Sequence, residues 1–88
     1  MGEEIERHEG YAAAKRWLSD GASETERASL AAGLAGGLTI VASRRLYPTL
    51  LEAIGTERAP EGREVDFGAS AWMRGFRDAV VEELGEPG

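Results

Sequence analysis

Hydrophobic residues recur at helical spacing in three long stretches of the chain. These stretches cover residues 3–18, about 24–45 and about 69–84. The stripes of the first and third stretches consist of Tyr11, Ala14 and Leu18, and of Met73, Phe76, Val80 and Leu84. Apolar residues at every third or fourth position give a helix one hydrophobic face. The pattern therefore predicts three main helices that pack through these faces.

Local signals mark where helices begin and end. The run "SETE" at residues 23–26 has the spacing of a capping box, in which the serine hydroxyl and the second glutamate satisfy each other's backbone amides. Pro48 disfavours helical geometry at the residue before it and suits the first position of a new helix. A short helix is therefore predicted after Pro48, closed by Gly55.

Outside these helices the longer connection and the C-terminal tail are predicted to be irregular. Because every regular element is predicted to be a helix, the predicted fold class is all-α. Residues 56–68 hold a proline, two glycines and charges of both signs, which is typical of a loop. The tail, residues 85–88, is expected to fray. The prediction for residues 1–88 is a single small helical domain, a bundle of three main helices plus the short helix after Pro48.

A rival interpretation places a strand in the second stretch. The run "LTIVAS" is rich in β-branched residues and follows two glycines, and "EVDF" would have to supply its partner strand. Two strands alone are only marginally stable, so the all-helical interpretation is favoured.

The stretch "LAAGLAGGLTIVASRR", residues 30–45, carries no charge before its last two positions. On a helix, Leu30, Leu34, Leu38 and Val41 would form a core stripe. Glycines inside a helix each cost about 1 kcal/mol relative to alanine, so close packing must offset them. Small residues one turn apart allow another backbone to approach. The expected homodimer contact consists of Ser29, Ala32, Gly33, Gly36, Gly37 and Ile40. A helix of the same chain is the alternative neighbour.

The length of this apolar stretch argues against a membrane span. Sixteen helical residues rise about 24 Å, whereas the hydrocarbon core of a bilayer is about 30 Å thick. We therefore expect no membrane span.

A second surface is expected to bind a protein partner. Tryptophan, tyrosine and arginine are the residue types that concentrate binding energy at interfaces. The residues assigned to this surface are Arg16, Trp17, Tyr47, Trp72 and Arg74. The alternative is that both indoles cap the ends of the bundle.

Composition narrows the class of partner. The 88 residues include 16 acidic and 10 basic side chains, for a formal net charge of −6. A phosphate backbone requires a basic face, so direct nucleic-acid binding is not expected. The N-terminal run lacks a basic region followed by an apolar one, as a secretory signal would have, so a cytoplasmic location is expected.

No residue pattern indicates catalysis, a cofactor or a metal. His8 is the only histidine and the chain has no cysteine, so a transition-metal site would need carboxylates or a second subunit. The glycines of residues 33–37 lack the Lys-Ser or Lys-Thr that completes a phosphate-binding loop. His8 is expected to lie on a solvated helix face, and the protein is predicted not to be an enzyme.

Two short runs share a pattern, Gly-aromatic-x-x-Ala: "GYAAA" at residues 10–14 and "GFRDA" at residues 75–79. The run "WMRGFRDA" and the pair "GY" resemble short runs of the ribosome modulation factor family. That resemblance implies a ribosomal partner among the candidates. The chain departs from the family, which is strongly basic and lacks the long alanine- and glycine-rich stretch.

The function expected from the sequence is that of a small, acidic, non-enzymatic protein-binding module, acting as an accessory, adaptor or inhibitor. One alternative is a helical subunit that holds an apolar ligand or supports a partner enzyme. Another is an acidic antagonist of phage type that mimics nucleic acid.

Overall fold

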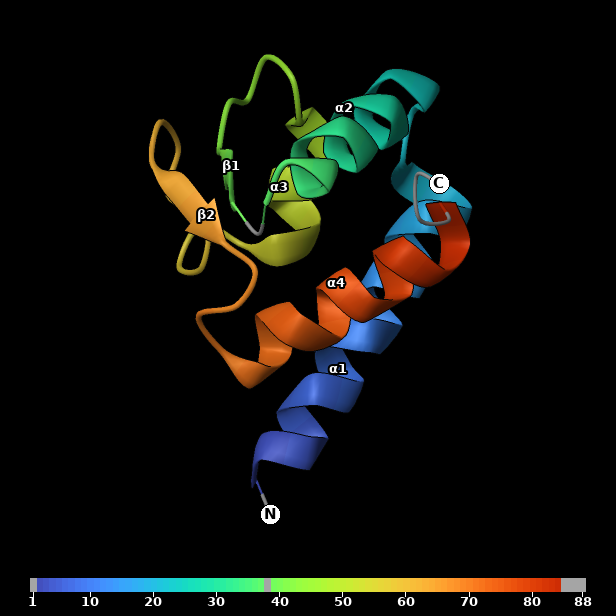
Figure 1. Cartoon of the computed structure of the whole chain (residues 1–88), viewed down its shortest axis with the longest axis vertical. Helices are drawn as coiled ribbons and strands as arrows, with labels where there is room; N and C mark the ends of the chain where they lie inside the picture. Colours follow the sequence, from blue (N-terminus) through green and yellow to red (C-terminus); the bar gives the residue numbers. More distant parts are fainter. Residues whose placement is uncertain (1, 38, 85–88) are drawn as a thin grey trace.

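The computed structural model describes residues 2–37 and 39–84, which form helices and one small sheet. The elements are α1 (Gly2–Arg16), η1 (Trp17–Gly21), α2 (Glu24–Ala35), β1 (Thr39–Val41), α3 (Pro48–Ile54), β2 (Glu64–Asp66) and α4 (Ala71–Leu84). In Figure 1, α1 and α4 lie side by side in the lower half, and α2, α3 and the two strands lie above them. The structure is mostly helical, which agrees in outline with the predicted all-α class, whereas the predicted bundle of three main helices is not confirmed.

The second predicted helix is shorter than expected. Helix α2 ends at Ala35, and Gly36 is its C-terminal cap. Two successive glycines lower helix propensity, and the β-branched residues that follow favour extended backbone. The predicted continuation to residue 45 is wrong, because Thr39–Val41 form β1. Leu38, assigned to the core stripe, and the tail 85–88, expected to fray, lie outside the described residues.

The two strands form the pair that the rival interpretation required. Strand β1 runs antiparallel to β2, and Ile40 faces Val65 across the ladder. Both of these side chains are buried, whereas their strand neighbours are exposed. The prediction that residues 56–68 form only a loop is therefore wrong at 64–66. A two-stranded ribbon is stable here because its apolar face packs on the helices.

The local signals for helix boundaries are confirmed. Ser23 and Glu26 form both hydrogen bonds of the capping box at the start of α2. Pro48 stands in the first turn of α3, and Gly55 ends that helix with φ 96°. Glycine adopts this positive φ without the steric penalty that a side chain brings.

The core is built around aromatic rings from distant parts of the chain. Phe76 of α4 is fully buried, and its ring centroid lies 5.5 Å from that of Trp72 and 6.1 Å from that of Trp17. Phe67 adds a fourth ring, 6.2 Å from Phe76. These separations are those of interacting aromatic pairs. The aromatic cluster therefore joins η1, the segment after β2 and α4 into one packed unit.

Helices α1 and α4 approach closely through a reciprocal pair of glycines. A Cβ built on Gly10 would lie 2.8 Å from the carbonyl carbon of Trp72, and one built on Gly75 would lie 2.7 Å from the carbonyl carbon of Arg7. Each glycine thus packs against the backbone that lies three residues before the other glycine. The two Gly-aromatic-x-x-Ala runs are therefore the two halves of one helix contact.

In residues 2–37 and 39–84, no helix combines the length and the apolar character needed to span a bilayer.

Candidate functional site

The aromatic residues assigned to a partner surface lie in the core. Trp17 and Tyr47 are each 4% exposed and Trp72 is 8% exposed. The Trp17 indole donates to the Thr49 hydroxyl at 2.9 Å, and the guanidinium of Arg58 lies 4.1 Å from the Trp72 ring centroid. A side chain buried in this way is unable to present itself to a partner. The expectation of exposed aromatic anchors is corrected, because a domain this small needs its large rings for the core.

The two arginines of the same predicted surface are exposed, but they serve different regions. Arg16 lies at the end of α1 beside a shallow pocket that also includes Asp20 and Glu52. Arg74 lies on α4, where it contacts Glu3. The structure therefore does not gather the five predicted partner residues into one surface.

The residues assigned to a dimer contact divide into an outward and an inward set. Ala32, Gly36 and Gly37 are exposed, and Ser29 is half-buried. Ile40 is buried, and its Cγ2 would lie 2.9 Å from a Cβ built on Gly33. Gly33 therefore makes room for β1 of the same chain. Gly33 and Ile40 form the inward set. They agree with the alternative prediction that this face packs against the same chain, although the neighbour is a strand and not a helix.

The outer face of α2 consists of small side chains. The residues exposed along this helix after its first residue are Thr25, Ala28, Ala32 and Ala35. Only Glu26 and Leu30 of α2 are buried. The solvent face of a globular-protein helix is ordinarily charged or polar. We call the set Thr25, Ala28, Ala32, Ala35 and Gly36 the α2 small face.

A buried carboxylate connects α2 to α3. Glu26 is 1% exposed, and its Oε2 accepts from the backbone amides of Thr49 at 2.9 Å and Leu50 at 3.0 Å. Its Oε1 accepts from the Thr49 hydroxyl at 2.6 Å and from the Ser23 hydroxyl at 3.1 Å. One side chain therefore caps the N-termini of two helices, where backbone amides otherwise lack partners.

These hydrogen bonds keep Glu26 ionised. Burial alone would raise the pKa of the carboxyl, but bonds from the Thr49 hydroxyl and from backbone amides outweigh burial and hold that pKa below its ordinary value. The capping box was visible in the sequence, whereas the bonds to α3 were not. Glu26 is thus a structural carboxylate, with its lone pairs directed at this chain's own donors.

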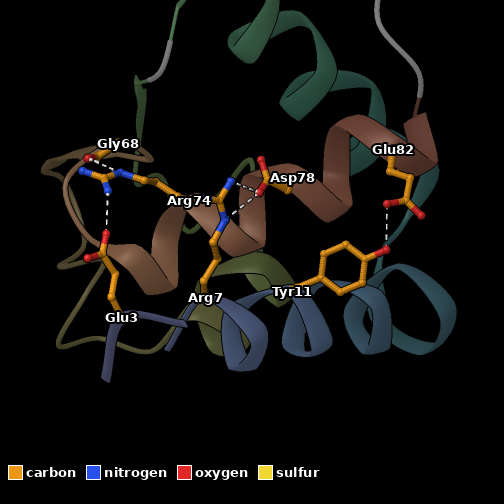
Figure 2. Close-up of polar contacts among 7 residues, drawn as sticks. All are labelled: Glu3, Arg7, Tyr11, Gly68, Arg74, Asp78 and Glu82. Carbon is orange, nitrogen blue, oxygen red and sulfur yellow. Dashed lines mark hydrogen bonds and ion pairs between the residues drawn. The ribbon is translucent and has the colours of Figure 1, made fainter. Parts of the chain in front are cut away.

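Polar side chains connect α1 to α4 along one side of the helix pair, as Figure 2 shows. Arg7 donates to Asp78 Oδ2 from Nε at 3.0 Å and from Nη2 at 2.6 Å. Arg74 donates to the Gly68 carbonyl at 3.3 Å and to Glu3 at 3.4 Å. Both pairs join residues 71 positions apart, which is the register of two helices running in the same direction.

The same register continues to the C-terminal end of the pair. The Tyr11 hydroxyl donates to Glu82 at 2.7 Å, and Lys15 contacts Glu82 at 3.1 Å and Glu83 at 3.2 Å. The hydrogen bond to Glu82 raises the pKa of Tyr11 and also that of Lys15, while the bond from Tyr11 lowers the pKa of Glu82. Exposed ion pairs contribute little stability, so their main effect here is to fix register.

His8 is exposed on α1, and it borders a hollow that also includes Glu4, Tyr11 and Asp78. Within the described part of the chain, no three His, Asp or Glu side chains gather in a metal-binding arrangement.

Comparison of the chain with protein-family models, with curated proteins and with solved structures finds no match. The candidate function therefore rests on the geometry of the α2 small face and of the polar groups around α1 and α4.

Proposed function

We propose that this protein is a non-enzymatic protein-binding module that associates with a second copy through the α2 small face. The observation that carries the proposal is the exposure of Ala28, Ala32 and Ala35 along a helix whose outer face has no charged side chain after its first turn. A helix that shows only small side chains allows another helix to approach its backbone closely. The acidic surface and the absence of a catalytic pattern in the sequence support a binding role.

The proposed contact differs from the one expected from the sequence. It retains Ala32, Gly36 and the flank at Ser29, adds the other members of the α2 small face, and omits Gly37, which follows the helix. It also omits Gly33 and Ile40, which face each other inside the chain. A two-fold axis would place each copy's small face against the same face of its partner. Alanine and glycine on both sides make this contact flat and close.

The first experiment tests whether this face holds two copies together. Ala32→Glu introduces a charge at the proposed contact, and glutamate is nearly as good a helix former as alanine, so the monomer is expected to stay folded. Ala69→Glu makes the same change at an exposed alanine outside α2. We expect sedimentation to show a dimer for the native protein and for Ala69→Glu, and a monomer for Ala32→Glu. A native protein that stays monomeric at several hundred micromolar would refute the proposal.

The second experiment tests the geometry of the contact. The chain has no cysteine, so a single introduced thiol reports only on its own surroundings. If α2 faces α2 across a two-fold axis, Ala32→Cys brings two Cα atoms to about 4–7 Å, the range that a disulfide spans. Ala32→Cys should then form a covalent dimer under mild oxidation, whereas Ala69→Cys should not. Equal cross-linking of both variants would indicate random collision.

A further inference from the structure

Three arginines surround one hollow at the N-terminal end of α4. The hollow has a volume of about 230 Å³ and is lined by Arg7, Phe67, Gly68, Arg74, Arg77 and Asp78. Three positive charges and one negative charge therefore line it, and Glu3 adds a second negative charge where it contacts Arg74. Asp66 adds a third negative charge beside the hollow, where its Oδ1 accepts from the Gly68 amide at 2.8 Å. The residues that line the hollow are nevertheless net positive, in a chain whose net charge is −6.

Arg77 is the member of this group that lacks a partner. It is half-buried, and its Nε atom is buried without a hydrogen bond to any described residue. Buried polar groups in folded proteins are nearly always hydrogen-bonded, and an exception indicates a missing water, ion or ligand. A guanidinium group has donors and no acceptor, so whatever satisfies Arg77 must supply an acceptor atom.

The other two arginines are held in place and still have donors to offer. Arg7 binds Asp78 through Nε and Nη2, while Arg74 uses Nε and Nη1 for its bonds to Gly68 and Glu3. Nη1 of Arg7 and Nη2 of Arg74 have no partner in the described part of the chain. Figure 2 shows both side chains extended along the same side of the helix pair. Ion pairs thus orient two of the three guanidinium groups before any ligand arrives.

We propose that this hollow binds a phosphoryl group, as inorganic phosphate or as a small phosphate monoester. A carboxylate has about four lone-pair positions on its two oxygens, fewer than the N–H groups of three guanidinium groups, and Asp78 already provides one carboxylate to Arg7. A phosphoryl group presents at least three acceptor oxygens and pairs with arginine in fixed geometry. This site is distinct from the α2 small face, and the proposal does not depend on self-association.

The test is a titration of the 88-residue chain with inorganic phosphate at constant ionic strength. NMR monitors the binding through the chemical shifts of the Phe67 and Gly68 amides. We expect saturable shifts with a dissociation constant of roughly 1 mM or lower. Arg77→Gln should weaken binding roughly tenfold or more, because it removes charge-assisted donors. Arg45→Gln makes the same charge change at an exposed arginine outside the hollow, and it should leave the constant within about twofold.

A second variant guards against loss of the fold. Arg77→Lys keeps the charge but loses the planar fork, and it should bind phosphate more weakly than the native protein while retaining the same circular dichroism.

A titration with phenyl phosphate in place of inorganic phosphate identifies the source of the phosphoryl group. Tighter binding of the ester points to a monoester, and weaker binding points to the free ion. Acetate that binds as tightly as phosphate, an absence of saturable shifts, or equal weakening by Arg45→Gln would overturn the proposal.

Discussion

Glu26 is the side chain whose replacement tests the fold most directly. Replacing it with leucine keeps a similar volume at a position that is 1% exposed, but removes every acceptor that the carboxylate provides. The backbone amides of Thr49 and Leu50, in the first turn of α3, then lose their partner. The Ser23 backbone amide and hydroxyl lose their acceptor as well.

The size of the effect follows from these unpaired groups. Each buried donor left without an acceptor costs about 1–3 kcal/mol, so two backbone amides cost about 2–6 kcal/mol. The burial of a leucine side chain offsets part of this, and we expect a loss of about 3–4 kcal/mol in the free energy of unfolding. For a domain of this size, that corresponds to a fall of about 12–32 °C in melting temperature.

The assay is urea unfolding followed by circular dichroism, with Glu24→Leu as the matched control. Glu24 lies in the same helical turn but is exposed, and it should cost about 1 kcal/mol or less. Glu26→Gln should fall between the two variants, because its amide oxygen still accepts from the backbone of α3. If Glu26→Leu and Glu24→Leu unfold within about 0.5 kcal/mol of each other, then the Glu26 carboxylate does not hold α3.

The pH dependence of stability provides an independent check on Glu26. Its pKa in the folded protein is below the ordinary value of 4.5, so the folded state binds this proton less readily than the unfolded state. The stability contributed by the carboxylate is therefore fully present above about pH 4.5 and is lost as the pH falls through the folded pKa. The difference between the native protein and Glu26→Gln should be constant at neutral pH and should narrow below about pH 4.5.

Two further substitutions test the helix contact and the core. Gly75→Ala should lower the free energy of unfolding by about 2 kcal/mol or more, because its Cβ meets the backbone of Arg7, while Gly37→Ala, with open space around it, should be neutral or slightly stabilising. Urea midpoints measure both, and equal midpoints would contradict the close helix contact. Trp72→Ala should cost about 3–5 kcal/mol, because the indole is 8% exposed and stacks on Phe76. An unchanged thermal midpoint for Trp72→Ala would show that the ring lies outside the core.

The sequence by itself determined the elements whose hydrogen bonds are local. The capping box at Ser23 and Glu26, the helix start at Pro48 and the helix end at Gly55 all involve groups within a few residues of one another. The apolar stripe of α4 is likewise visible as a spacing along the chain, and most of its members are buried. These features depend on backbone geometry over one or two turns, so their residues alone specify them.

Only the tertiary structure decided which distant segments meet. The β-branched run at Thr39–Val41 becomes a strand because Glu64–Asp66 supplies the other half of its ladder. Pro48 predicts a helix start whether or not Glu26 is present. Only the fold brings the Glu26 carboxylate to the backbone amides in the first turn of that helix. Whether Trp17 serves as an interface anchor or as core depends on what α4 places beside it. The packing of the whole chain determines which distant segments contact each other. Tertiary packing overrides local propensity where the packed arrangement buries more apolar surface and satisfies more hydrogen-bond donors than the locally preferred one.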